Sequence, residues 1–123
     1  MASPTTHTEN ALSIDVVDEP GELRLVWRGK SQDREPGRFL MPLLLKALAD
    51  SGANNQRLVL DFSSLEYMNS SSFAPVVKLL GEAARGAQQV ELLYSQNRKW
   101  QALSFSALRA FETPDKRIAL RAR

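Results

Sequence analysis

Cysteine is absent from the 123 residues of this chain, and histidine occurs once, as His7. The absence of cysteine excludes disulfides, thiolate nucleophiles and cysteine metal sites, and it is consistent with a reducing cytoplasm. No apolar run approaches the ~18 residues that a transmembrane helix requires, so no membrane insertion is expected. Carboxylates form no cluster along the sequence, and neither a metal nor a cofactor is predicted.

Sequence motifs of catalysis are also missing. There is no Gly-x-Ser-x-Gly elbow, no Walker loop and no Gly-x-Gly-x-x-Gly fingerprint. A serine nucleophile needs a base within hydrogen-bonding reach. The one histidine lies near the amino end, Lys78 falls on a predicted surface helix, and an ordinary carboxylate such as Asp61 is a poor base for a hydroxyl. We therefore expect a protein that is not an enzyme.

Charge is low and uneven along the chain. The net charge is only +2, and the basic excess is confined to the last eight residues, which include Lys116, Arg117, Arg121 and Arg123. No aromatic side chains are interleaved with these cations to stack on bases, so a nucleic-acid partner is not predicted. Apolar residues make up 43% of the sequence, which is enough to build the core of one domain.

The amino-terminal third predicts a tail followed by a hairpin. Residues 1–10 are polar and lack a signal-peptide core, so they are predicted to be a disordered tail, and residues 11–123 are predicted to form a single domain. Apolar residues alternate with polar ones over 12–16 and again over 23–27. This period of two predicts two strands, which pair antiparallel across the turn at Glu19-Pro20-Gly21.

Helices and strands alternate over the rest of the chain. The predicted elements are a helix from Arg38 or Phe39, a strand at 58–60, a helix from Ser71 or Ser72 to Arg85, a strand at 90–94, a helix at 100–111 and a strand at 118–120. The complete order is strand–strand–helix–strand–helix–strand–helix–strand. It predicts an α/β fold in which helices cover a mixed, mostly parallel sheet.

The periodicities of these elements converge on one core. The residues predicted to be buried are Leu58, Val59, Leu60, Val76, Val77, Leu80, Val90, Leu92, Leu103, Ala107 and Leu108. In the third helix Trp100 falls on the apolar face and is expected in the core. Phe105 falls off that face. It is therefore a candidate partner-contact residue, ranked ahead of Arg98 and Lys99.

Four consecutive polar residues, Asn69-Ser70-Ser71-Ser72, stand where a buried strand is followed by a helix. The first turn of a helix has unpaired N–H groups and a partial positive charge, so side-chain oxygens or a phosphate can bind there. Capping explains one such residue but not four. Ligands of open α/β sheets usually bind at this end of a strand. The residues alone support simple capping and a functional site equally.

The region from Leu58 to Leu80 resembles the STAS domain of anti-sigma factor antagonists. The resemblance rests on the segments Leu58-Val59-Leu60-Asp61-Phe62, Leu65-Glu66-Tyr67-Met68 and Asn69-Ser70-Ser71-Ser72-Phe73. In the order of elements it extends from about Leu12 to Leu120. It implies a STAS-like fold, and by position Ser70 matches the serine that a partner kinase phosphorylates in such proteins. Asp61 matches the Asp that ends the preceding strand.

Two positions depart from the usual motif of that family. Asn69 stands where the family usually has Asp, and Ser72 stands where it usually has Gly. The Asn resembles a neighbouring group, small bacterial regulatory phosphoproteins with an Asn-Ser-Ser motif. Members of that group act on a diguanylate cyclase and are switched by a kinase–phosphatase pair. The resemblance therefore leaves the partner open.

The resemblance implies a cytoplasmic bacterial regulator that binds a protein kinase of anti-sigma type, with a cognate phosphatase, in a partner-switching pathway. Phosphorylation is expected at Ser70, with Ser71 and Ser72 as alternates. The expected neighbours of this switch site are Asp61, Asn69, Tyr67 and Phe73. Regulation of a diguanylate cyclase is an alternative function. A small-molecule or nucleotide-binding module that uses the same helix N-terminus is a second alternative.

Overall fold

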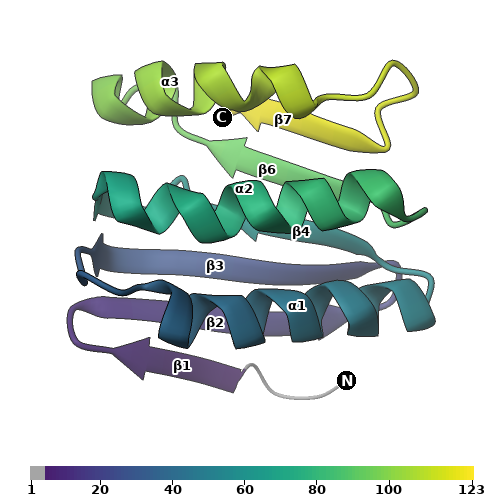
Figure 1. Cartoon of the computed structure of the whole chain (residues 1–123), viewed down its shortest axis with the longest axis horizontal. Helices are drawn as coiled ribbons and strands as arrows, with labels where there is room; N and C mark the ends of the chain where they lie inside the picture. Colours follow the sequence, from purple (N-terminus) through teal and green to yellow (C-terminus); the bar gives the residue numbers. More distant parts are fainter. Residues whose placement is uncertain (1–4) are drawn as a thin grey trace.

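Seven strands form one sheet in the computed structural model, which describes residues 5–123 (Figure 1). The strands are β1 (Thr5–Glu9), β2 (Leu12–Glu19), β3 (Glu22–Ser31), β4 (Arg57–Asp61), β5 (Leu65–Met68), β6 (Val90–Tyr94) and β7 (Ile118–Ala122). The helices are α1 (Gly37–Ala53), α2 (Ser70–Arg85) and α3 (Lys99–Ser106), which continues into the 3₁₀ helix η1 (Ala107–Phe111). The prediction of a mixed α/β fold is confirmed.

The strand order across the sheet is β1-β2-β3-β4-β6-β7, and β5 pairs with β3 beyond the end of β4. Strand β2 runs antiparallel to both of its neighbours, β1 and β3, whereas β3, β4, β6 and β7 run parallel. The register of the parallel strands places Leu25 beside Leu60, Leu60 beside Leu92, and Leu92 beside Leu120. The carboxyl ends of these strands therefore share one edge, at which α2 and α3 begin (Figure 1).

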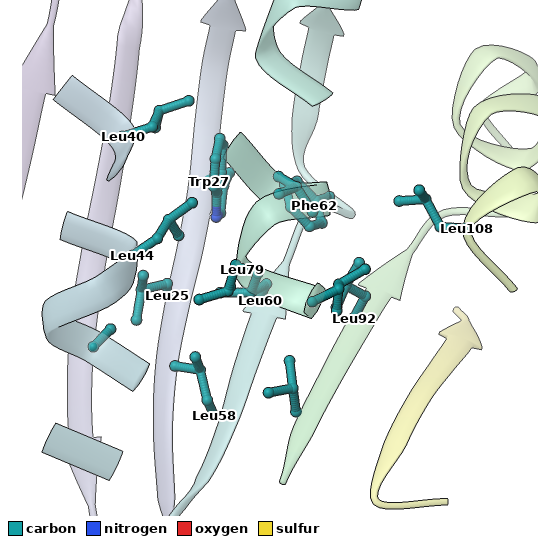
Figure 2. Packing of buried hydrophobic residues seen from close by; sticks show 14 of the residues in the cluster. Leu25, Trp27, Leu40, Leu44, Leu58, Leu60, Phe62, Leu79, Leu92 and Leu108 are labelled. Atoms are coloured by element: carbon teal, nitrogen blue, oxygen red, sulfur yellow. The ribbon is translucent and has the colours of Figure 1, made fainter. Parts of the chain in front are cut away.

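All three α-helices cover the same face of the sheet (Figure 1). Side chains alternate along each strand, so Leu58, Leu60 and Leu92 point toward the helices and are fully buried (Figure 2). No helix of residues 5–123 covers the opposite face. Val59 points to that face and is nevertheless 1% exposed. The sheet therefore lies between the helix N-termini on one face and the side chains that point to the uncovered face.

Aromatic rings fill the part of the core between the sheet and the helices α2 and α3. Trp27 and Phe62 are fully buried, with ring centroids 4.6 Å apart, and Phe62 lies 4.8 Å from Phe105 (Figure 2 shows the first pair). Burial of most predicted core residues is confirmed: Leu58, Val59, Leu60, Val76, Leu80, Val90, Leu92 and Leu108. Val77 is only half-buried and packs against the edge of the core.

The predicted disordered tail is wrong for residues 5–9, which form β1 at the edge of the sheet. Main-chain pairing with β2 holds this strand, and the Thr6 hydroxyl donates to Asp15 Oδ1 at 2.8 Å. Because an edge strand leaves its side chains largely exposed, it needs no apolar alternation, and its sequence gives no strand signal. The other part of the predicted tail, residues 1–4, lies outside the described residues.

The predicted apolar face of the third helix is wrong in part, although Leu108 is buried and Trp100 and Phe111 pack against the core. Leu103 is 76% exposed and Ala107 is exposed, whereas Phe105 is fully buried. The buried face is instead formed by Gln101, Phe105 and Leu108. A polar residue on the inner face hides the true periodicity, and the change from α to 3₁₀ geometry at Ala107 shifts the phase of the remaining helical residues. The short strand β5 is also absent from the sequence prediction.

Candidate functional site

Helix α2 begins one or two residues earlier than the sequence predicts, because Asn69 is its N-cap. Asn69 has extended backbone angles, and its side-chain oxygen accepts a hydrogen bond from the Ser72 backbone N–H at 3.0 Å. Its side-chain nitrogen donates to the Asp33 carbonyl oxygen at 2.9 Å. Both ends of the amide are therefore used, so Asn69 fixes where α2 starts and joins it to the loop after β3.

Pro75 led the sequence prediction toward a later helix start, because proline is tolerated in a first turn. With Asn69 as the N-cap, Pro75 lies in the second turn of α2. The hydrogen bond that proline cannot make is the one to the carbonyl of Ser71, four residues earlier. Ser71 is exposed, so water can reach this carbonyl group. The proline is therefore compatible with a helix that begins at Ser70.

Ser72 is a structural residue in this arrangement. It is fully buried, its hydroxyl donates to Asn69 Oδ1 at 2.6 Å, and it accepts from the Ser31 hydroxyl at 2.7 Å. Ser31, at the end of β3, is itself 2% exposed. The chain of hydroxyls ties the first turn of α2 to β3. A kinase cannot reach Ser72 without opening this turn, so the structure does not favour Ser72 as an acceptor.

Ser70 and Ser71 are the exposed residues of the polar run. Their hydroxyls make no hydrogen bond to any residue in 5–123, and the same holds for their backbone N–H groups. Ser70 is the first residue of α2 and Ser71 the second. The first turn of α2 contains no acidic residue. This helix start therefore combines free hydroxyls with the unpaired donors and partial positive charge of a helix N-terminus.

Asp61 is not a neighbour of this helix start, contrary to the sequence prediction. It follows Leu60 in β4, so its side chain points to the opposite face of the sheet, where it is 4% exposed. Its carboxylate accepts from Arg123 Nη1 at 3.0 Å and from Ser63 Oγ at 2.6 Å, and Arg24 Nη1 lies 3.5 Å away. Asp61 therefore fastens the carboxyl-terminal strand to the centre of the sheet.

Tyr67 and Phe73 flank the serines along the chain and differ in burial. Tyr67, in β5, is 47% exposed and is one of the few large hydrophobic residues in 5–123 that are exposed. Phe73, in the first turns of α2, is half-buried, with its ring 5.5 Å from that of Phe105 in α3. Phe73 thus connects the beginning of α2 to α3, whereas Tyr67 is available to a partner.

Among the predicted partner contacts, Phe105 is wrong because it is a core residue. Its ring lies 5.7 Å from Tyr94 and 6.5 Å from Trp100, in addition to its contacts with Phe62 and Phe73. Lys99 is exposed and Arg98 is partly exposed. The residue that sequence reasoning missed on this surface is Leu103, the most exposed of the large apolar side chains described.

Gln101 is a second residue that sequence reasoning missed. It is fully buried, and its side-chain nitrogen donates to the carbonyls of Phe62 at 2.7 Å and Leu65 at 2.9 Å. Its side-chain oxygen accepts from the Ser95 backbone N–H at 2.7 Å. Gln101 thus provides hydrogen-bond partners for backbone groups that follow β4 and β6. These bonds fix α3 against the edge of the sheet where α2 begins. A single Gln in an amphipathic helix gives no sequence signal for this role.

A cavity of about 330 Å³ lies elsewhere, between α1 and the first strands. Its apolar surface comes partly from Val16, Leu23 and Leu43, and its polar rim includes the carboxylates of Asp18 and Asp50. No residue of α2 lines this cavity. In residues 5–123, no group of three or more His, Cys, Asp or Glu is arranged to hold a metal ion. No helix of that range is long and apolar enough to cross a membrane.

No protein-family model matches the sequence, and no curated protein does either. Solved structures do match. The chain is similar to an uncharacterized protein from the DUF3478 family with a SpoIIAA-like fold, from Shewanella loihica PV-4, with a TM-score of 0.55. The two are 16% identical over 100% of this chain and 90% of that chain. The chain therefore has the SpoIIAA-like fold, which is the fold of STAS domains. The resemblance stated from the sequence is confirmed for the fold.

Proposed function

We propose that this chain is a protein-binding regulator whose binding is switched by phosphorylation of Ser70. The observation that carries the proposal is the division of the serine run. Ser72 is held by buried hydrogen bonds. The Ser70 hydroxyl, at the first residue of α2, is exposed and makes no hydrogen bond within residues 5–123. The STAS fold supports a binding module, and the positional match of Ser70 to the phosphorylated serine of anti-sigma factor antagonists supports the modification.

A phosphate on Ser70 would change the surface more than the fold. It adds a charge of about −1.5 to −2 and three acceptor oxygens. The α2 N-terminus stabilises such a charge, because its N–H groups and macrodipole face the phosphate. A partner docked over the same turn would have to desolvate the phosphate. Exposed Glu66 adds to the negative field, whereas Asp61 does not, because it is ion-paired on the opposite face of the sheet.

The partners that we propose are a protein kinase of anti-sigma type, which binds unmodified Ser70 and phosphorylates it, and a cognate phosphatase that reverses the modification. A diguanylate cyclase is the alternative effector for the same switch. Both versions require the same surface, which includes exposed Tyr67 beside the start of α2. They differ only in which protein is released when Ser70 is phosphorylated.

The acceptor is tested by incubating the protein with native cell lysate and ATP and mapping the phosphate by mass spectrometry. Phosphate is expected on Ser70 in the unmodified sequence and in the Ser71→Ala and Ser72→Ala variants. It should be absent from Ser70→Ala. Phosphate found only on Ser71 would refute the assignment of the acceptor, and no phosphate on any of the serines would remove the basis of the proposal.

A further inference from the structure

The outer face of α3 carries an apolar side chain that the fold does not use. Gln101 and Phe105 form the buried side of this helix, and Leu103 lies between them in sequence, about 180° around the helix axis. Leu103 is 76% exposed. By helical spacing its surface neighbours are Lys99, one turn earlier, and Ala107, one turn later, both of which are exposed. A small apolar area next to a cation therefore faces solvent.

The charge around Leu103 has one sign. Residues 95–111 contain Arg98, Lys99 and Arg109 but no carboxylate. Arg109 is engaged, because it pairs with Glu112 at 3.2 Å and donates to the Tyr94 hydroxyl at 2.7 Å. Within the described part of the chain, Arg98 and Lys99 form no salt bridge. Lys99, one turn from the exposed leucine, and Arg98, which precedes it in the chain, are therefore available to an external anion.

These two cations also stand at the unfavourable end of the helix. Arg98 is the N-cap of α3 and Lys99 its first residue, and the N-cap makes no side-chain hydrogen bond to the first turn. A helix N-terminus carries a partial positive charge, so it favours carboxylates and disfavours cations. No acidic residue occupies the first turn. A carboxylate from outside would neutralise both the cations and the uncapped helix end.

The same edge of the sheet carries the proposed switch. Helices α2 and α3 both begin at the carboxyl ends of the parallel strands (Figure 1). Phe73, near the start of α2, contacts the last turn of α3 through Phe105, and the two rings are 5.5 Å apart. A partner that spans this edge can contact α3 and sense the charge at Ser70. A phosphate on Ser70 would then repel a partner of negative charge.

We propose that the outer face of α3 docks an acidic, amphipathic segment of a protein partner. An apolar side chain of that segment packs on Leu103, and its carboxylates meet Arg98 and Lys99. This inference rests on the proposed function, for which it names the chemistry of the partner. A second copy of this chain is a poor occupant, because residues 95–111 contain no carboxylate that could meet Arg98 and Lys99 of the other copy.

The probe is a blocked synthetic peptide with Glu on the polar face and Leu on the apolar face of a helix, titrated into the ¹⁵N-labelled full chain. The control peptide has Lys in place of every Glu. Amide shifts are expected at residues 98–110 with the acidic peptide and not with the basic one. Leu103→Ser and Lys99→Glu should each weaken binding about tenfold. The matched controls Leu45→Ser on α1 and Lys78→Glu on α2 should bind like the wild-type chain, because they change an exposed leucine and an exposed cation elsewhere.

Several results would overturn the inference: shifts that map elsewhere, equal binding of both peptides, unchanged affinity in Leu103→Ser, or no binding at about 1 mM peptide. Binding to phosphatidylglycerol vesicles that is lost in Leu103→Ser, without peptide binding, would assign the face to a membrane instead. A dimer that dissociates on Leu103→Ser in sedimentation would assign it to a second copy. Ser70→Ala should bind the acidic peptide normally, so this test and the phosphate mapping fail independently.

Discussion

The side-chain oxygen of Asn69 accepts two hydrogen bonds from Ser72, one from its backbone N–H at 3.0 Å and one from its hydroxyl at 2.6 Å. These two hydrogen bonds distinguish the roles of four polar residues that look alike in sequence. Asn69 and Ser72 build the helix start. Ser70 and Ser71 lie between them, exposed and free of hydrogen bonds within the described chain.

The capping role of Asn69 predicts a loss of stability on substitution. Asn69→Ala should lower the free energy of unfolding by about 1–2 kcal/mol, because it removes the cap of α2 and the bond to the Asp33 carbonyl. Ser70→Ala should change it by no more than about 0.5 kcal/mol, as for an exposed side chain without partners. Urea denaturation of both variants measures the difference. Equal losses would contradict the assignment of Asn69 as the cap.

The buried pair of hydroxyls predicts coupling between two positions 41 residues apart. Ser72→Ala should cost about 1–3 kcal/mol, because it leaves the buried Ser31 hydroxyl without its acceptor. Ser31→Ala should also destabilise the chain, but the double variant should lose less than the sum, since both partners are then absent. A thermal or denaturant double-mutant cycle gives the coupling energy. Strict additivity would show that the two hydroxyls do not interact.

Phe105 is buried and Leu103 is exposed, so truncation of these two side chains of α3 should affect stability differently. Phe105→Ala should destabilise the fold by about 3–5 kcal/mol, because its ring packs against several aromatic neighbours in the core. Leu103→Ala should lie within about 0.5 kcal/mol of wild type, because its side chain is mostly in water. Denaturation midpoints of the two variants test this prediction. A larger loss for Leu103→Ala than for Phe105→Ala would contradict the burial of Phe105 and the exposure of Leu103.

Acid should weaken the attachment of the carboxyl-terminal strand. The pKa of Glu112 lies below its ordinary value of 4.5, first because its carboxylate accepts from the Leu120 backbone N–H at 3.0 Å and also because Arg109 donates to it. The unfolded chain therefore takes up this proton first as pH falls. The stabilisation is complete above about pH 4.5 and is lost as pH falls through the lower pKa of the folded state.

Unfolding free energy measured against pH tests this prediction. It should fall below about pH 4.5, and Glu112→Gln should fall less steeply, because glutamine does not titrate. Asp15, whose pKa is lowered by its hydrogen bond to Arg28, contributes a decline of the same sign that remains in the variant. Identical acid slopes for the two proteins would show that Glu112 does not couple to folding.

Sequence pattern predicted the elements whose burial is continuous or periodic. Strand β4 lies between β3 and β6 and is apolar on both faces, and α2 has a clear apolar face. The hydrophobic pattern did not predict elements whose structure is determined by backbone pairing or by a buried polar group. Edge strand β1 is held by its main chain, and Gln101 occupies the buried face of α3 through three hydrogen bonds. Neither feature produces hydrophobic periodicity.

At the candidate site, the position of the serine run could be predicted but not the role of each residue. Which side chain caps α2 depends on backbone angles at Asn69, which the sequence does not specify. The direction of Asp61 could have been predicted, because alternation with Leu60 places it on the uncovered face. The bonds of Asp61 to Arg123 and Arg24 then explain this strand-end carboxylate as structural.

Phosphorylation as a switch is the central claim, and partner affinity tests it most directly. A kinase recovered with the Ser70→Ala chain from native lysate is purified. Its affinity is measured for the unmodified chain, the chain phosphorylated at Ser70, Ser70→Ala and Ser71→Ala. We expect Ser70→Ala and Ser71→Ala to bind like the unmodified chain, and phosphorylation at Ser70 to weaken binding at least about tenfold. Equal affinity for the phosphorylated and unmodified chains would contradict the switch.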